Sequence, residues 1–408
     1  MKSFSDLDML PTLHETLTEK GLISLTEIQS RAMPALLQGR SVVGVAETGS
    51  GKTLAYALPV LHLLKKRELD GDVSEVDSQP RAAVIVPTRE LGEQVTRVFK
   101  PFTHTTRLRV RSVLGGTDID VAKRNVSGRF EVLVATPGRL VKLLERRLID
   151  LRQVQILVFD EADQMLDQGF IASVHTIVDA CRADRQMALF SATVPPKVQE
   201  LMTKLFSGAE VIRSEGSHQV VSGLTTKNIE IPNGKRFPIL EELLSKNVEG
   251  GTMLFTNTRD QVDKLAQEMK KAGYASAIYR GEMDKLERRN NLKLFREGKI
   301  QFLISTDLAS RGLDVDHVGR VINYHLPQQM ENYIHRVGRT ARAGRKGLVV
   351  NFVTERDLAL IAKVEGLRTK KSAAAKLDSS GDWPEEPTHT KTTRKVVTPN
   401  RVTVRKRA

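Results

Sequence analysis

Short apolar runs alternate with helical patterns along most of this chain. Runs rich in Val, Ile, Leu, Phe and Ala predict buried strands over residues 41–46, 82–86, 110–114, 132–135, 156–160 and 187–191. A second series predicts strands over residues 252–256, 275–279, 301–305, 318–323 and 348–352. Residues 207–222, between the two series, are polar and without periodicity, which is typical of a linker. Because strands that alternate with helices favour parallel sheets, the pattern predicts an α/β fold in two lobes, residues 1–206 and 223–367, with a ligand cleft between them.

Charge is distributed unevenly along the chain. Its 408 residues include 63 basic and 49 acidic side chains, a formal net charge of +14. Residues 368–408 hold eleven basic and four acidic residues, so half of this net charge lies in the last tenth of the chain. Their Ser, Thr, Pro and Ala content predicts a basic, flexible tail. Such a tail favours a polyanionic partner, and a solubilising extension is the alternative.

The single cysteine, Cys181, excludes a disulfide framework and favours a reducing compartment. It lies in a helical pattern over residues 171–182, where a small core residue is the expected role. No apolar run approaches the roughly 18–20 residues that cross a bilayer. The first ten residues carry acids where a signal peptide is apolar. We therefore expect a soluble, cytoplasmic protein without a membrane partner.

A glycine-rich turn, AETGSGKT at residues 46–53, joins the first predicted strand to a helical pattern over residues 54–64. Gly49 and Gly51 allow the backbone to curl until its N–H groups point at an anion. Lys52 can then reach the β- and γ-phosphates of a nucleotide, and the Thr53 hydroxyl can bind Mg²⁺. Ala46 stands where the phosphate-loop pattern has glycine, so a solvated glycine-rich loop is the alternative at this point.

Three acids in four residues, DEAD at 160–163, follow the predicted strand over residues 156–160. A carboxylate at the carboxyl end of a parallel strand, beside a phosphate loop, is where a magnesium-binding acid is expected. Asp160 is predicted to hold the ion, partly through water, because Mg²⁺ retains much of its hydration shell. Glu161 is predicted to orient or deprotonate the attacking water. Without the phosphate loop, surface acids at a helix start would be the better interpretation.

These segments occur with others in the order and spacing of a known family. The further segments are PTREL at 87–91, Gly115-Gly116, TPGR at 136–139, SAT at 191–193, STDLASRGLD at 305–314 and HRVGRTAR at 335–342. Together they resemble the DEAD-box ATP-dependent RNA helicases over residues 4–354, and the wording GEM and RTARAGRKG resembles a bacterial, SrmB-type branch. The resemblance implies two tandem RecA-like domains joined by a short linker, with ATP and Mg²⁺ as cofactors.

The resemblance also assigns nucleotide-binding positions. GLISLTEIQ at residues 21–29, with Phe4 upstream, resembles the family's adenine-reading segment, although Leu25 and Glu27 stand where the family usually has prolines. The implied nucleotide contacts are Phe4, Thr26, Gln29, Ala46, Glu47, Thr48, Gly49, Ser50, Gly51, Lys52 and Thr53, with Asp314 on the ribose. Arg339 and Arg342 resemble the arginine fingers that meet the γ-phosphate, and Lys52, Asp160 and Glu161 complete the catalytic set. Asp163, Ser191, Thr193 and His335 resemble the residues that couple hydrolysis to RNA grip.

A third set resembles the family's contacts with the RNA backbone. These positions are Thr88, Arg89, Gly115, Gly116, Thr136, Gly138 and Arg139 in the first lobe, and Thr256, Lys285, Arg288, Thr306 and Arg311 in the second. Glycine N–H groups and Arg or Thr donors suit sugar and phosphate without reading base identity. Lys285 stands where Gln is common, so it can meet a phosphate but lacks the acceptor of an amide.

The function implied by the resemblance is RNA-dependent ATP hydrolysis that separates short RNA duplexes locally or remodels RNA–protein complexes. Expected partners are structured or ribosomal RNA and proteins of ribosome assembly or RNA decay, with the chain a monomer and the basic tail a nonspecific RNA tether. Two alternatives stay open. One is a DNA-directed helicase of the same superfamily, and the other is an RNA-annealing chaperone or scaffold with incidental ATPase activity.

Overall fold

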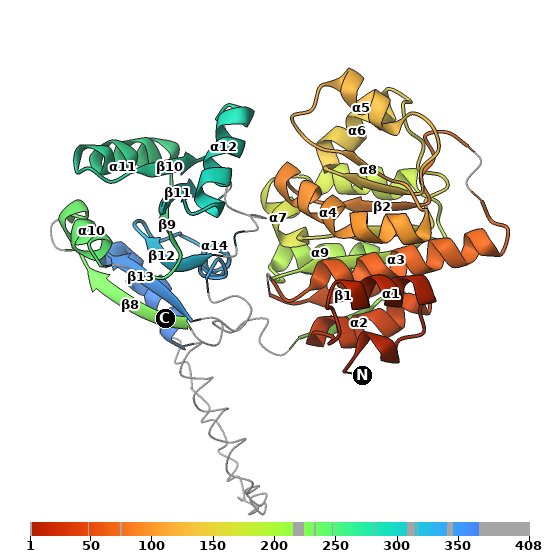
Figure 1. The fold of residues 1–408 in the computed structure, drawn as a ribbon, viewed down its shortest axis with the longest axis horizontal. Coiled ribbons are helices and arrows are strands. Elements are labelled where there is room, and N and C mark those ends of the chain that lie inside the picture. The colour runs from red at the N-terminus through yellow and green to blue at the C-terminus, as the bar shows by residue number, and fades with distance from the viewer. Residues whose placement is uncertain are drawn as a thin grey trace, which may run out of the picture. The chain divides into compact units, whose positions relative to one another are not determined.

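The computed structural model describes residues 2–47, 49–73, 76–214, 224–231, 234–246, 248–281, 283–307, 315, 317–340 and 346–366. Thr48, Arg311, Asp314, Arg342 and the predicted tail over residues 368–408 lie outside these ranges, as does the side chain of Lys285. Residues 2–214 are called the first lobe below, and residues 224–366 the second lobe. Each lobe contains one parallel sheet with helices on its faces (Figure 1).

The sheet of the first lobe has the strand order β3-β4-β2-β5-β6-β1-β7, and every pairing in it is parallel. Its strands are β1 (Val42–Val45), β2 (Ala82–Ile85), β3 (Val110–Val113), β4 (Val132–Ala135), β5 (Ile156–Phe159), β6 (Gln186–Ser191) and β7 (Glu210–Arg213). The helices are α1 (Pro11–Glu19), α2 (Glu27–Leu37), α3 (Lys52–Leu69), α4 (Arg89–Thr106), α5 (Ile119–Val126), α6 (Pro137–Glu145), α7 (Ala162–Asp167), α8 (Ile171–Ala180) and α9 (Pro196–Leu205).

The sheet of the second lobe has the order β10-β11-β9-β12-β13-β8, again with parallel pairings. Its strands are β8 (Leu224–Glu230), β9 (Gly251–Thr256), β10 (Ser276–Tyr279), β11 (Phe302–Thr306), β12 (Val318–Asn323) and β13 (Gly347–Val353). Its described helices include α10 (Phe237–Leu244), α11 (Arg259–Lys271), α12 (Lys285–Arg296) and α14 (Met330–Val337). All eleven predicted strands are therefore confirmed to within one residue at either end, together with the α/β fold of two parallel sheets.

Two strands were not predicted. Residues 210–213, expected within the linker, instead form β7, which pairs with β1 in the register Val42–Glu210. In this edge strand only Ile212 is buried, at 3% exposure, so the apolar signal is one residue long. β8 is also an edge strand, paired with β13 over its whole length, and none of its residues is fully buried. An edge strand pairs with one neighbour only and is partly exposed to solvent, so it needs few apolar residues. This explains why neither strand was predicted from the apolar pattern.

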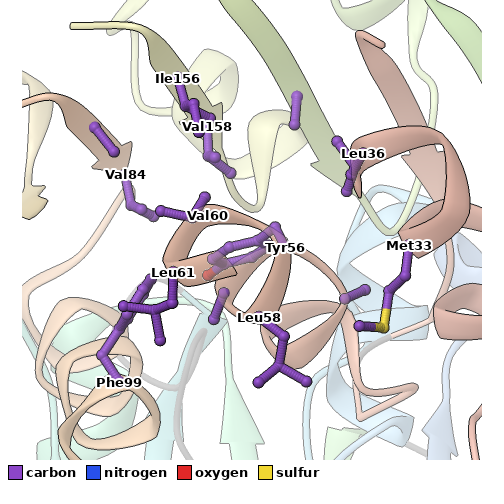
Figure 2. Close-up of a cluster of buried hydrophobic side chains, with 14 of the residues drawn as sticks. Met33, Leu36, Tyr56, Leu58, Val60, Leu61, Val84, Phe99, Ile156 and Val158 are labelled. Carbon is purple, nitrogen blue, oxygen red and sulfur yellow. The ribbon is translucent and has the colours of Figure 1, made fainter. Parts of the chain in front are cut away.

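The core of the first lobe lies on both faces of its sheet. Successive strand residues point to opposite faces, so Val42 packs with α1 to α4 and Val43 packs with α5 to α9. Figure 2 shows the first of these layers, in which Tyr56 and Leu61 of α3 lie near Val84 and Val158 of the central strands. Burial on both faces explains why the strands appear in the sequence as continuous apolar runs.

Cys181 follows α8 directly and is 8% exposed in the second core layer of the first lobe. Burial raises the pKa of its thiol to about 12, so the group is uncharged at neutral pH. The interpretation of Cys181 as a small core residue is confirmed. Within the described ranges, every helix is too short or too polar to cross a membrane.

Candidate functional site

The phosphate-loop residues lie between β1 and α3, at the carboxyl edge of the first sheet. Gly49 and Gly51 have φ values of +86° and +89°, a backbone conformation that glycine adopts without strain. Lys52 is the first residue of α3 and is 7% exposed. Its ammonium donates to the carbonyl oxygens of Ala46 and Glu47, each at 2.7 Å. The predicted phosphate ligand is thus held inside its own loop, and the hydroxyl of Ser50 donates to Glu47 O at 2.7 Å.

Gln29 packs directly against this loop. Its side chain is 3% exposed, with Oε1 accepting from the Thr26 N–H at 2.9 Å and Nε2 donating to Gly51 O at 3.0 Å. A Cβ at Gly51 would lie 2.5 Å from Gln29 Nε2, so the glycine permits the close approach. Phe4 is 3% exposed within the core layer of α1 to α4. The structure therefore brings Thr26 and Gln29 to the phosphate loop, and their adenine-reading role stays a prediction.

Asp160 follows β5 and is 2% exposed. Its Oδ2 accepts from the Tyr56 hydroxyl at 2.8 Å, and its Oδ1 accepts from the Glu161 N–H at 2.9 Å. Burial raises the pKa of Asp160 to about 6, against the opposing effect of the Lys52 charge. A buried carboxylate that resists ionisation is stabilised when a cation binds to it. The site therefore favours a bound cation at Asp160.

Tyr56 was missed by the sequence analysis. It is fully buried, its ring centroid lies 5.4 Å from that of Phe190, and its hydroxyl donates to Asp160 Oδ2 at 2.8 Å with the Thr53 side chain close by. Burial, and then the negative charge of Asp160, raises the Tyr56 pKa well above its usual value. The hydroxyl thus holds Asp160 and lies close to Thr53, the two residues predicted to hold Mg²⁺. The available signal was helical spacing, because Tyr56 lies three residues after Thr53 on α3.

The residues present fit a magnesium ion bound together with a triphosphate. Among the described residues, no group of three or more His, Cys, Asp and Glu side chains could hold a metal ion. The site instead supplies one carboxylate, from Asp160, and one hydroxyl, from Thr53, beside the Lys52 ammonium. Mg²⁺ is commonly held by one or two carboxylates while phosphate oxygens and water complete its shell.

Glu161 has a φ of +52°, in the left-handed region that is unfavourable for a residue with a Cβ. Its side chain is 5% exposed and accepts from Gln164 Nε2 at 3.0 Å. Gln164 is itself fully buried and was also missed by the sequence analysis. The unusual backbone conformation and the hydrogen bond together fix the carboxylate in one orientation. A carboxylate that orients a water molecule needs such a fixed position.

Asp163 connects two strand ends. Its Oδ2 accepts from the Thr193 N–H at 3.0 Å and from the Thr193 hydroxyl at 2.7 Å. The Ser191 hydroxyl accepts from the Asp163 N–H at 3.2 Å and donates to Thr193 O at 2.7 Å. His335 Nε2, on α14, lies 3.5 Å from Asp163 Oδ2. Burial alone would raise the pKa of Asp163, but the nearby His335 ring and the hydrogen bonds from Thr193 hold it well below its usual range. The structure thus brings all four predicted coupling residues together.

The arginines of the HRVGRTAR segment differ in environment. Arg336 is 1% exposed, pairs with Asp307, and has its guanidinium 5.2 Å from the ring centroid of Phe255. It also donates to Asn323 Oδ1 at 3.1 Å and Asn257 Oδ1 at 2.9 Å. Arg336 organises the centre of the second lobe, and it was not among the residues predicted from the sequence. Arg339 is 2% exposed with Nε donating to His335 O at 3.1 Å, and its role at the γ-phosphate stays a prediction.

The predicted RNA contacts of the first lobe lie at or just after the carboxyl ends of its strands. Thr88 and Thr136 are the residues before α4 and α6, and the Thr88 hydroxyl accepts from the Leu91 N–H at 3.3 Å. Arg89 Nη1 donates to Gly115 O at 3.3 Å. Arg139 donates to Thr117 O, which holds its guanidinium beside the Gly115-Gly116 turn. Gly138 is the second residue of α6, after Pro137.

In the second lobe, Thr256 and Thr306 end β9 and β11, so they also lie at a carboxyl edge. Thr256 is fully buried, and its hydroxyl donates to Thr258 O at 3.2 Å. The Arg288 guanidinium lies 5.7 Å from the ring centroid of Tyr279 and pairs with Glu90 of the PTREL segment. Thr256 and Thr306 therefore lie at strand ends, where parallel sheets bind ligands, whereas Arg288 lies within α12.

Comparison with protein families gives two matches along the chain. Residues 26–201 match the model of the DEAD/DEAH box helicase, and residues 235–344 match the model of the helicase conserved C-terminal domain. An ATP-dependent RNA helicase CshA of Listeria monocytogenes is 33% identical over 371 residues, covering 91% of this chain and 70% of the relative. A DEAD-box ATP-dependent RNA helicase RhpA of Helicobacter pylori is 36% identical over 353 residues, covering 86% of this chain and 70% of the relative.

Solved structures share the fold. The S. cerevisiae Dbp5 structure bound to RNA and ADP BeF3 superposes with a TM-score of 0.80 at 29% identity, covering 90% of this chain and 93% of that chain. Mss116p bound to single-stranded RNA and AMP-PNP has a TM-score of 0.76 at 24% identity, covering 89% of this chain and 76% of that chain, and it supports the fold alone.

Proposed function

We propose a residue-level mechanism for this chain, which belongs to the DEAD/DEAH box helicase family and is an ATP-dependent RNA helicase. It binds RNA, hydrolyses ATP in response, and uses ATP and Mg²⁺ as cofactors. The observation that carries the mechanism is the position of Asp163, three residues after the predicted magnesium ligand and hydrogen-bonded to Thr193. Through this position, one short segment contacts both the nucleotide residues and the coupling residues.

The nucleotide is held by the turn between β1 and α3. Lys52 exchanges its two carbonyl partners for phosphate oxygens, and the backbone N–H groups of the turn surround the anion. Gln29 stabilises the turn through its hydrogen bond to the carbonyl oxygen of Gly51. Thr53 and Asp160 hold Mg²⁺, which when bound neutralises charge on the phosphates. Tyr56 holds Asp160 in place beside Thr53.

Glu161 orients the attacking water and takes a proton from it. Its carboxylate is held by Gln164, so it meets the water in one orientation. Arg339 and Arg342 contribute guanidinium donors for the charge that spreads over the transferring phosphoryl group. Such arginines are worth about 10³–10⁵ in rate where they have been measured.

RNA is held through its backbone by the strand-end residues of both sheets. Threonine hydroxyls, arginines and glycine N–H groups bind sugar and phosphate and leave base identity unread. Because ATP and RNA both favour the arrangement in which Asp163 meets His335, their binding is cooperative. ATP hydrolysis then releases the strand. The expected activity is local separation of short duplexes or remodelling of RNA–protein complexes.

Replacing Glu161 with Gln tests this mechanism, because the substitution keeps the shape and removes the base. The matched control is Glu145→Gln at the exposed end of α6. We expect RNA-stimulated ATPase activity to fall by about 10²–10⁴-fold in Glu161→Gln and strand separation to fall with it. Undiminished remodelling without hydrolysis would instead favour the annealing chaperone. Equal stimulation of ATPase activity by DNA and RNA would favour the DNA-directed alternative.

The physiological RNA is a separate question. Nothing in the backbone-directed contact set selects a sequence, so structured or ribosomal RNA, with partners in ribosome assembly or RNA decay, is the proposed context. Crosslinking the protein in cells and sequencing the attached RNA tests it. Removing residues 368–408 should raise the apparent KM for RNA and spare the maximal ATPase rate, because a basic tail contributes mainly nonspecific phosphate contacts. An apparent KM that does not move would leave the tail as a solubilising extension.

A further inference from the structure

Two hollows open on the second lobe, between the start of α10, the first turns of α11 and the carboxyl end of β12. One has a volume of about 430 Å³ and is lined by Lys264 and Tyr324 among others. The other has a volume of about 680 Å³ and reaches Asn257, the residue after β9. Arg236, Gln261 and His325 line both hollows. These three side chains therefore form the shared wall of one composite site.

The composite site has an excess of positive charge. Its cations are Lys235, Arg236, Lys264, Arg356 and Lys363. Of its two carboxylates, Glu268 lies close to the Tyr324 hydroxyl, and Asp357 Oδ2 already accepts hydrogen bonds from the Thr354 N–H at 2.9 Å and hydroxyl at 2.6 Å. Within the part of the chain that the structure describes, none of the five cations forms an ion pair. A polar hollow with unpaired cations and satisfied acids favours an anion.

Two buried polar atoms of the shared wall lack partners among the described residues. They are Arg236 Nε and His325 Nδ1. The rest of the His325 region is well held, because its N–H donates to Phe255 O at 3.1 Å and its carbonyl accepts from Arg336 at 2.6 Å. Buried polar groups in folded proteins nearly always have partners, so these two mark a place where a further group is expected. Burial, with the charges of Arg236 and Arg336, lowers the pKa of His325 to about 4, so Arg236 supplies the charge of the wall at neutral pH.

The site adjoins the predicted RNA path. Asn257 lines the larger hollow and directly follows Thr256, a predicted backbone contact. Its side chain is fixed, because Nδ2 donates to Leu326 O at 2.9 Å and Oδ1 accepts from Arg336 at 2.9 Å. Asn257 is exposed at the carboxyl end of β9, so an RNA strand that follows this sheet edge and extends past Asn257 would bring its next phosphates to Arg236 and Lys264.

From this arrangement we infer that Arg236 and Lys264 form an accessory phosphate site, which holds the RNA backbone beyond the contacts at the strand ends. The inference rests on the proposed function, because it extends the same strand. Arg236 suits the role since a guanidinium can bind two phosphate oxygens together, and Lys264 adds a point charge from the exposed face of α11. The site adds affinity for longer RNA without reading sequence.

The experiment compares Arg236→Gln/Lys264→Gln with Lys270→Gln/Lys271→Gln in the full chain. The control pair removes the same charge from the far end of the same helix, roughly 10 Å from Lys264 along its axis. Binding is measured by fluorescence anisotropy with two single-stranded RNAs, one covering only the strand-end contacts and one extended at both ends. Each is titrated over a salt series, and RNA-stimulated ATPase activity is measured in parallel.

For Arg236→Gln/Lys264→Gln we expect binding of the longer RNA to weaken by about 25-fold near 0.1 M salt, or about fivefold for each lost phosphate contact. The slope of log K against log salt should fall by about 1.4, since each contact to a single strand contributes about 0.7. Binding of the shorter RNA and the ATPase activity that it stimulates should match those of the unmodified chain, and the control pair should change neither RNA.

Three results would overturn the inference. They are equal losses in the two double variants, an unchanged salt slope for the longer RNA, or weaker binding of inorganic pyrophosphate by Arg236→Gln/Lys264→Gln while its binding of the longer RNA is unchanged. The last result would assign the site to a free phosphorylated molecule. In each case RNA-stimulated ATPase activity would show that the proposed function still holds. An unmodified chain that neither binds RNA nor responds to it would contradict the proposed function itself.

Discussion

Replacing Tyr56 with Phe would remove one hydroxyl from the candidate site and leave the packing of the ring in place. The ring is fully buried in the layer shown in Figure 2, where it contacts Phe190 at 5.4 Å between centroids. Its hydroxyl donates to Asp160 and lies close to Thr53. The substitution therefore separates the positioning of Asp160, a predicted magnesium ligand, from the packing of α3.

The magnitude follows from the environment of Asp160. Its Oδ2 is buried and has the Tyr56 hydroxyl at 2.8 Å, so the substitution leaves this oxygen without its donor. A hydrogen bond to a charged group contributes about 1.5–3 kcal/mol. Outer-shell partners of metal ligands change metal affinity by about 10–100-fold when they are removed. We therefore expect Mg²⁺ to bind about tenfold more weakly to Tyr56→Phe, the lower end of both ranges.

The direction of the pH dependence can also be derived. Burial already raises the pKa of Asp160 to about 6, and loss of a donor to the carboxylate raises it further. At neutral pH a larger fraction of Asp160 is then protonated, and Mg²⁺ must displace that proton. As the pH rises to about 9 this competition disappears, so the difference in Mg²⁺ requirement between Tyr56→Phe and the unmodified chain should shrink.

The assay is steady-state ATPase activity at saturating RNA over a range of free Mg²⁺ concentrations. We expect the half-saturating Mg²⁺ concentration to rise and the maximal rate to be retained, because Tyr56 acts through Asp160 and not on the substrate. Tyr274→Phe, the same change beside Phe302 in the second lobe, is the control. A lower maximal rate at an unchanged Mg²⁺ midpoint would refute the positioning role, and so would a midpoint that does not depend on pH.

Three further substitutions test other parts of the structure. Gly51→Ala places a Cβ 2.5 Å from Gln29 Nε2 at a φ of +89°, so the free energy of unfolding should fall by about 1–2 kcal/mol and calorimetry should show weaker ATP binding. Arg336→Lys breaks the buried pair with Asp307, and chemical denaturation should show a loss of about 3 kcal/mol. Because burial holds the pKa of His325 at about 4, stability present above its usual pKa of 6.5 is lost as the pH falls toward 4. After allowance for partial exposure this loss is about 1–2 kcal/mol, and denaturation midpoints at several pH values should show it reduced in His325→Gln.

Much of the fold was predictable from the sequence because its strands are buried on both faces. Val43 and Val84, for example, belong to continuous apolar runs with turn signals at both ends, and such runs indicate parallel strands. β7 escaped prediction because burial of Ile212 alone is enough for an edge strand. Its pairing with β1 is a long-range contact, which the periodicity of residues 210–213 does not predict.

The candidate site divides in the same way. Lys52 was predictable because it ends the glycine-rich turn after β1, and Asp160 because it directly follows β5, and strand ends in a parallel sheet meet at one edge. Tyr56 and Arg336 were not, because each appears in the sequence as one more residue of a helix. Only packing decides that the Tyr56 hydroxyl meets Asp160, or that Arg336 is the buried arginine of its segment.

Asp160 and Asp163 are both buried, lie three residues apart and have opposite electrostatic settings. Asp160 receives a tyrosine hydroxyl and one backbone N–H, and its pKa is raised to about 6. Asp163 receives the Thr193 hydroxyl and N–H, with His335 beside it, and its pKa is lowered. A buried carboxylate with few donors is stabilised most by a cation that binds with the ligand and dissociates with it. A carboxylate that already accepts hydrogen bonds from protein donors is stabilised most by keeping those bonds. Environment, and not residue type, therefore makes Asp160 the group that responds to the nucleotide and Asp163 the group that holds the connection to Thr193.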